Sequence, residues 1–241
     1  MGIYERDFTV RYCDVNENNV LSFTGLMNLL QEIAGMHSSE VGYGINNIPK
    51  TGLTWFLLYW KIKIYTKPKW NTKLHIKTWA RKLDKACSFR DFEVYNENNN
   101  KMAIATSKWA LLDVNKNSIS RIPSNMNEQY GIVEKCVFDE PINTKIEIPT
   151  ESTFVYEYTT QRRDIDTNHH VNNLYYLDYA FQALPDEIYY NTNFTDIEIS
   201  YKKQLKINEK INCFYSNENN THIVTIKNYN STCVHAIIKI K

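Results

Sequence analysis

Five residues from Asp166 to His170 place a carboxylate, an amide and an imidazole just before an expected helix. Side chains alternate along an extended chain, so we expect Asp166, Asn168 and His170 to point to one side. Neutral imidazole can take a proton from water, a carboxylate can orient that imidazole or polarise the water, and an amide can donate to a developing oxyanion. This group of residues therefore suits the attack of water on an acyl carbon, without a metal or cofactor.

Other interpretations of the same segment start from the same residue types. Asp, Asn and His are common in turns and before helices, where their side chains satisfy backbone groups. An EF-hand calcium loop would hold Asp164, Asp166 and Asn168 in its first, third and fifth places, but its glycine and final glutamate places hold His169 and Tyr175. Zinc is not favoured either, because the two adjacent histidines leave opposite faces of an extended chain and no cysteine pair has ligand spacing. We expect no metal.

The composition indicates a globular protein with one large core or two smaller ones, since 43% of the 241 residues are hydrophobic. No uninterrupted apolar run approaches the roughly 18 residues that span a bilayer, and residues 1–6 lack the apolar core of a signal peptide. The five scattered cysteines suit free thiols in a reducing compartment, so we expect a cytoplasmic protein with no membrane partner. A formal net charge of +1 argues against nucleic acid as a partner.

An internal repeat organises the chain. The segment from Asp14 to Phe23 aligns without gaps on the segment from Asp164 to Asn173, which indicates that the two halves are related. In this alignment Val20 stands where the second copy has His170, so the second copy alone holds the complete polar group.

Each copy of the repeat is followed by an apolar stripe at helical spacing, which predicts a buried helix in each half. The stripes are Leu26, Leu29, Leu30 and Ile33 in the first half, and Leu174, Leu177, Phe181 and Leu184 in the second, with Ser22 and Asn172 as predicted N-caps. Strand-like runs then follow at residues 88–95 and 102–112, and at residues 222–227 and 233–240. This order predicts an antiparallel sheet wrapped on a helix in each half, with a linker between Cys136 and Thr153.

The stretch from Asp164 to Leu205 resembles the C-terminal half of acyl-acyl carrier protein (acyl-ACP) thioesterases, the plant plastid enzymes and their bacterial relatives. The first half of the chain resembles the same family, so the similarity covers essentially the whole sequence. The positions that carry it are the string DIDTNHHVNN with Tyr176, Pro185, Glu187 and Tyr201 in the second half, and the helix Met27–Glu32 and the strand Trp55–Ile64 in the first.

The resemblance implies an α+β fold of two tandem hotdog domains, each a long helix wrapped by an antiparallel β-sheet. The N-terminal domain would span residues 1–140 and house the acyl chain, and the C-terminal domain would span residues 150–241 and carry the catalytic residues. The implied reaction is hydrolysis of fatty acyl-ACP to free fatty acid and holo-carrier protein, which ends chain elongation. Acyl carrier protein is the implied partner, and its phosphopantetheine enters as part of the substrate, so no cofactor is implied.

Matched to the family motif, Asp166, Asn168 and His170 become the catalytic group. Plant members have a catalytic glutamate where this chain has Gln204, and an amide can hold a water but cannot take its proton. We therefore expect His170, oriented by Asp166, to activate water, Asn168 to bind the carbonyl or oxyanion, and Gln204 to align the nucleophile.

Two further groups of residues are predicted to contact the substrate. Cations that flank the catalytic segments could meet the phosphopantetheine or the acidic carrier, and they are Arg162, Arg163, Lys202 and Lys203. Apolar and aromatic residues of the first half could line an acyl tunnel, and they are Leu26, Leu30, Trp55, Leu57 and Trp60. A double hotdog already pairs two domains in one chain, so a monomer or a homodimer is expected.

Two rival functions stay open at this stage. An acyl-CoA thioesterase of the same fold would use a similar site on another carrier. A hotdog protein without catalytic activity would bind acyl chains and would explain Gln204 as a lost catalytic residue. A dehydratase fits less well, because hotdog dehydratases use a different histidine and acid set.

Overall fold

The chain forms two compact units in a computed structural model that describes residues 2–241. The first unit contains the residues up to Leu58 together with Ile62–Ile142, and the second contains Tyr59–Lys61 together with Asn143–Lys241. The change of unit after Ile142 falls inside the predicted linker. Among the described residues, no helix has both the length and the apolar character needed to cross a lipid bilayer.

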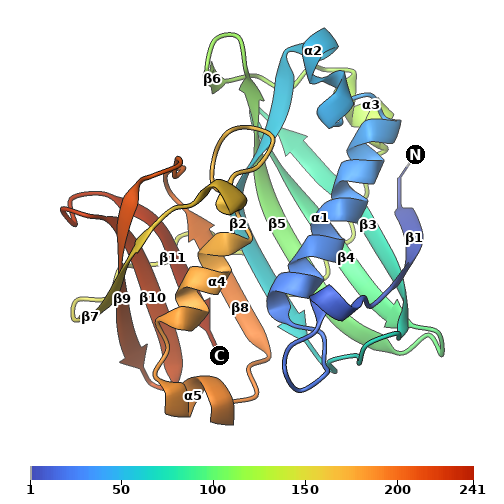
Figure 1. Cartoon of the computed structure of the whole chain (residues 1–241). Coiled ribbons are helices and arrows are strands. Elements are labelled where there is room, and N and C mark those ends of the chain that lie inside the picture. The colour runs from blue at the N-terminus through green and yellow to red at the C-terminus, as the bar shows by residue number, and fades with distance from the viewer. Residues whose placement is uncertain (1) are drawn as a thin grey trace. The chain divides into compact units, whose positions relative to one another are not determined.

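The first unit is an antiparallel sheet with one long helix on its face (Figure 1). Its strands follow the order β1-β3-β4-β5-β2, with β6 beside β5. They are β1 (Tyr4–Thr9), β2 (Leu53–Ile64), β3 (Lys73–Asp84), β4 (Cys87–Asn96), β5 (Lys101–Asp113) and β6 (Ser118–Ile119). The helical segments are η1 (Tyr12–Asp14), α1 (Phe23–Glu40), η2 (Ile45–Asn47), α2 (Ile48–Thr51) and α3 (Met126–Tyr130).

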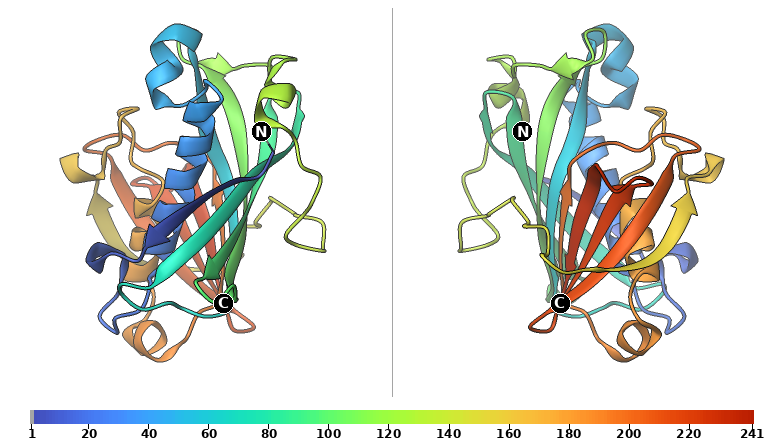
Figure 2. Two further views of the ribbon diagram at one scale, coloured as in Figure 1. Left: turned by 90° about the vertical axis from the view of Figure 1, so that its right-hand side faces the viewer. Right: turned by 90° about the vertical axis from the view of Figure 1, so that its left-hand side faces the viewer.

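Helix α1 runs along the sheet of the first unit, as both views in Figure 2 show. It begins where predicted, because the Ser22 hydroxyl accepts a hydrogen bond from the Gly25 backbone N–H at 2.9 Å. The predicted apolar stripe is confirmed, since Leu26, Leu29, Leu30 and Ile33 are all buried in the core. Gly25 allows close packing against the preceding loop, because a Cβ at this position would overlap the Asp14 carbonyl oxygen.

The second unit repeats this architecture with a shorter helix. Its strands follow the order β8-β11-β10-β9-β7, and neighbouring strands pair antiparallel. They are β7 (Thr153–Thr159), β8 (Asp196–Tyr201), β9 (Lys210–Glu218), β10 (Thr221–Asn228) and β11 (Val234–Ile240). The helical segments are η3 (Arg162–Asp164), α4 (Tyr175–Gln182) and α5 (Asp186–Asn191). The four strand-like runs predicted from the sequence are confirmed as β4, β5, β10 and β11.

Helix α4 differs from the prediction at both ends. Leu174 and Leu184 of the predicted stripe lie outside it, and its buried face also carries Tyr176 and Tyr179. The helix begins later than predicted, with Leu174 and not Asn172 at its N-cap. The Asn172 side-chain oxygen accepts from the Leu174 backbone N–H at 3.1 Å, in a turn before the helix. Asn172 therefore caps this turn, and its backbone carbonyl accepts from the Tyr175 N–H at 3.0 Å.

Candidate active site

The segment from Asp166 to His170 is a tight turn. The Asp166 backbone N–H donates to the His170 carbonyl at 2.8 Å, and the His169 N–H donates to the Asp166 carbonyl at 3.1 Å. His169 adopts a left-handed backbone with φ of 61°. The prediction of an extended segment with alternating faces is therefore wrong, because the turn chemistry of Asp and Asn prevails over extension.

The Asp166 carboxylate supports this turn from within. Its Oδ1 accepts from the Asn168 backbone N–H at 2.8 Å and from the His170 backbone N–H at 3.3 Å. It therefore orients the main chain of His170, and among the described residues it makes no hydrogen bond to the imidazole ring. The Asn168 side chain is exposed at the tip of the turn.

The His170 ring is half-buried, and its two nitrogens differ. Nδ1 is buried and makes no hydrogen bond within the described part of the chain. Nε2 is thus the ring nitrogen that can reach water or substrate. A neutral imidazole with one free lone pair can act as a general base, as its predicted role requires.

The first unit contains the same turn without the histidine. The Asn16 side-chain oxygen accepts from the Asn18 and Val20 backbone N–H groups at 3.1 and 3.2 Å, and Asn19 has φ of 59°. The internal repeat predicted from the sequence is therefore present at the level of single hydrogen bonds. Of the three predicted catalytic positions, two differ between the turns: the second unit has Asp166 and His170 where the first unit has Asn16 and Val20.

The segment of Gln204 lies beside the Asp166–His170 turn. The Val171 backbone N–H donates to the Leu205 carbonyl at 2.8 Å, and both side chains are buried, with 5% and 0% of their surface exposed. His170 and Gln204 adjoin this buried pair in the chain, and both are half-buried. The Val171–Leu205 hydrogen bond therefore brings the segment of the fourth predicted residue next to that of the histidine.

Asp164 lies two residues before the turn, at the end of η3. Its only predicted role was in the rejected calcium loop. Its side chain is 1% exposed, and Oδ2 accepts from the Gln161 backbone N–H at 2.8 Å and from the Tyr158 and Tyr179 hydroxyls at 3.0 and 2.9 Å. The matching Asp14 could have revealed this structural role, because the aspartate recurs in a copy of the repeat that lacks the histidine.

The predicted cations surround these segments on the surface of the second unit. All four are exposed: Arg162 and Arg163 lie in η3, and Lys202 and Lys203 lie between β8 and Gln204. The Arg163 guanidinium lies 3.6 Å from the Asp164 carboxylate. The role of these cations in binding stays a prediction.

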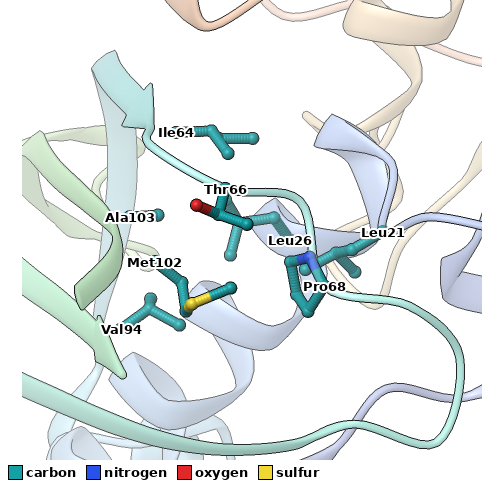
Figure 3. Close-up of a pocket in the computed structure, with 8 residues that line it drawn as sticks. All are labelled: Leu21, Leu26, Ile64, Thr66, Pro68, Val94, Met102 and Ala103. Carbon is teal, nitrogen blue, oxygen red and sulfur yellow. The ribbon is translucent and has the colours of Figure 1, made fainter. Parts of the chain in front are cut away.

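The predicted acyl-lining residues are mostly core residues of the chain. Leu26, Leu30, Leu57 and Trp60 are at most 4% exposed, and Trp55 is half-buried with its indole N–H donating to the Tyr130 hydroxyl at 3.0 Å. One of the five, Leu26, lines a small apolar pocket of the first unit (Figure 3).

Among residues 2–241, no group of three or more His, Cys, Asp and Glu side chains is arranged to hold a metal ion. The second unit thus offers one general base candidate, one amide at the turn tip, one further amide beside it, and a carboxylate that shapes the turn. This is a set for hydrolytic chemistry at a carbonyl.

Comparison with known proteins gives the family. The profile of the acyl-ACP thioesterase N-terminal domain matches residues 2–130, and that of the acyl-ACP thioesterase C-terminal domain matches residues 147–239. The chain belongs to the acyl-ACP thioesterase family. The Asp166–His170 turn lies within the C-terminal match, and the related turn with Val20 lies within the N-terminal match.

Curated relatives of this family are the chloroplastic oleoyl-acyl carrier protein thioesterase of Coriandrum sativum and oleoyl-acyl carrier protein thioesterase 2 of Arabidopsis thaliana. The first is 24% identical over 232 residues and the second 24% over 239, covering 89% and 92% of this chain. The chain spans 63% and 65% of the lengths of these two relatives.

Solved structures of the family share the fold. An acyl-ACP thioesterase from Bacteroides thetaiotaomicron matches with a TM-score of 0.87 and 25% identity, over 99% of this chain and 96% of that one. The 12:0-ACP thioesterase from Umbellularia californica matches with a TM-score of 0.87 at 19% identity, again over 99% and 96% of the two chains. The predicted tandem hotdog fold is confirmed.

Proposed function

We propose that this chain hydrolyses the thioester of fatty acyl-ACP, releasing free fatty acid and holo-carrier protein and so ending chain elongation. The observation that carries the proposal is the difference between two turns of one scaffold. The turn of the second unit holds Asp166 and His170 where the first unit has Asn16 and Val20. Family membership supplies the substrate class, which the geometry of the turn does not.

In the proposed mechanism, Nε2 of His170 takes a proton from a water molecule while the water oxygen attacks the acyl carbon. The electron pair of the carbonyl bond moves to oxygen, and the Asn168 amide donates to this oxyanion. The tetrahedral intermediate then collapses, the carbon–sulfur bond breaks, and the proton on His170 passes to the leaving thiolate. The products are a carboxylic acid and the carrier thiol.

Two neighbouring groups assist this base in the proposal. Gln204 precedes Leu205, whose carbonyl accepts from the N–H of Val171 next to the base. Its amide aligns the water, because it can accept from and donate to that water but cannot take its proton. Asp166 holds the His170 backbone N–H and contributes a negative charge near the imidazolium that forms. His170 is therefore the base, and the absence of a glutamate at position 204 does not remove it.

The carrier is recognised in this proposal by the exposed cations beside the site. Arg162, Lys202 and Lys203 flank the catalytic turn and the Gln204 segment, where an acidic carrier and its phosphate would approach. Exchanging all three for Ser should raise the KM for acyl-ACP at low salt and leave the KM for acyl-CoA less affected.

The test of this function is thiol release from matched acyl-ACP and acyl-CoA thioesters, measured on the parent and on the variant Asn168→Ala. We expect turnover of acyl-ACP to exceed that of acyl-CoA, and to fall by about 10²-fold in the variant, as for loss of an oxyanion donor. Equal turnover of both carriers would instead favour an acyl-CoA thioesterase. Acyl binding without thiol release by the parent would show a binding protein.

A further inference from the structure

The two units also differ in the side chains that pack next to the repeated turn. In the first unit an apolar pocket opens beside the turn that carries Val20, and Figure 3 shows its side chains around a common space. The lining residues are Leu21, Leu26, Ile64, Thr66, Pro68, Val94, Met102 and Ala103. In the second unit polar side chains replace three of the apolar ones.

Matching backbone hydrogen bonds establish which positions correspond. The Leu21 N–H donates to the Pro68 carbonyl at 2.7 Å, as the Val171 N–H does to Leu205 at 2.8 Å. Pro68 and Leu205 are therefore equivalent positions, and four residues earlier in each unit Ile64 is equivalent to Tyr201. When the gapless alignment of the two turns is extended, Leu26 is equivalent to Tyr176.

A second pair of bonds fixes the third position. The Thr66 N–H donates to the Met102 carbonyl at 3.2 Å, and the Lys203 N–H donates to the His235 carbonyl at 3.2 Å. Met102 therefore corresponds to His235. The pocket residues Leu26, Ile64 and Met102 are thus replaced in the second unit by two tyrosines and a histidine.

Each of these three polar side chains holds a backbone group beside the site. The Tyr176 hydroxyl accepts from the Leu205 N–H at 2.9 Å, and the Tyr201 hydroxyl donates to the Asn173 carbonyl at 2.9 Å. Nδ1 of His235 lies 3.1 Å from the Lys203 carbonyl. A carbonyl only accepts, so this nitrogen carries the proton and donates.

The three side chains are buried, with 3% exposure for Tyr176, 7% for Tyr201 and 3% for His235. Burial lowers the pKa of His235, which favours the neutral imidazole. A leucine, isoleucine or methionine could fill the same space but could not make these bonds.

We propose that His235, Tyr176 and Tyr201 are positioning residues of the active site, which hold the segment Lys203–Leu205 and the turn before α4. His235 fixes the residue before Gln204 and Tyr176 fixes the residue after it. These two bonds therefore hold Gln204 in place. The Val171–Leu205 hydrogen bond then fixes the position of His170 relative to Gln204. This inference rests on the proposed function for its kinetic readout, but not for its structural one.

The experiment compares the parent with His235→Met, which installs the residue of the first unit, and with His235→Asn. Asparagine places an N–H donor where Nδ1 of the imidazole lies, so it should restore the bond to Lys203. For acyl-ACP we expect kcat to fall at least tenfold in His235→Met with KM within about twofold, and to return within about threefold in His235→Asn. A kcat within threefold of the parent in His235→Met would overturn the proposal.

Amide hydrogen exchange of the peptide covering residues 202–206 gives the second readout, and it does not depend on turnover. Loss of one net hydrogen bond should speed exchange there by about fivefold in His235→Met and in Tyr176→Phe, and not in His235→Asn. Unchanged exchange in both variants would overturn the inference. If the parent released thiol from no thioester, the proposed function would fail and exchange alone would decide the positioning role.

Discussion

The exchange Asp166→Asn separates the structural part of this carboxylate from its chemical part. Oδ1 accepts two backbone N–H groups, and the Asn16 side chain accepts the corresponding two in the first unit. Asparagine should therefore preserve the turn, and we expect the free energy of unfolding to stay within about 1 kcal/mol of the parent. Asp166→Ala loses both bonds, which at about 1 kcal/mol each should lower the free energy of unfolding by about 2 kcal/mol.

Turnover should respond differently from stability. Asp166→Asn removes the negative charge beside His170, so we expect acyl-ACP hydrolysis to fall by about 10²-fold while the protein stays folded. The reverse exchange Asn16→Asp is the matched control, and it should change neither stability nor turnover appreciably. Urea unfolding and thiol release on the same samples provide both numbers. A loss of stability in Asp166→Asn as large as in Asp166→Ala would refute the equivalence of the two turns, and unchanged turnover would refute the role of the charge.

Further predictions concern packing, pH and the turn tip. Gly25→Ala should destabilise the protein by about 1–3 kcal/mol in thermal unfolding, because its Cβ meets a backbone carbonyl, whereas Gly35→Ala, with open space around it, should stabilise by about 0.5–1 kcal/mol. Burial and the nearby Arg90 cation lower the pKa of His37 from 6.5 to about 3. The unfolded chain therefore binds a proton that the folded chain does not, and stability should fall by roughly 1.4 kcal/mol per unit as the pH drops from 6.5 towards 3, a slope that His37→Asn should remove in acid titrations. Asn168→Ala should leave the midpoint of thermal unfolding unchanged, because the Asn168 side chain is exposed and makes no hydrogen bond to the described residues. A shifted midpoint would contradict this.

The sequence predicted the repeat because the same turn chemistry occurs twice. Hydrophobic spacing predicted α1, where Leu26, Leu30 and Ile33 pack on the sheet. It predicted α4 less well, since the inner face of that helix carries tyrosines that serve as hydrogen-bond partners as well as core residues. Periodicity scores apolar residues, so a helix built on buried tyrosine hydroxyls gives a weak signal.

The residues predicted for the site share one turn of the chain, but the geometry of that turn was not predicted. Asp166, Asn168 and His170 lie together, yet in a turn whose left-handed His169 the alternation rule does not anticipate. The doubled asparagine of the first copy, with Asn19 at the same position, was the available sign of this turn. His235 could not be found by local spacing, because strand pairing alone brings it to Lys203.

The central claim is that the imidazole of the second turn hydrolyses acyl-ACP. Thiol release from a single acyl-ACP should be measured under single-turnover conditions on the parent, on His170→Ala, and on Val20→Ala as the control at the matching position of the first unit. We expect hydrolysis by the parent and by Val20→Ala, and a loss of at least about 10²-fold in His170→Ala. Hydrolysis by His170→Ala at the rate of the parent would contradict the account.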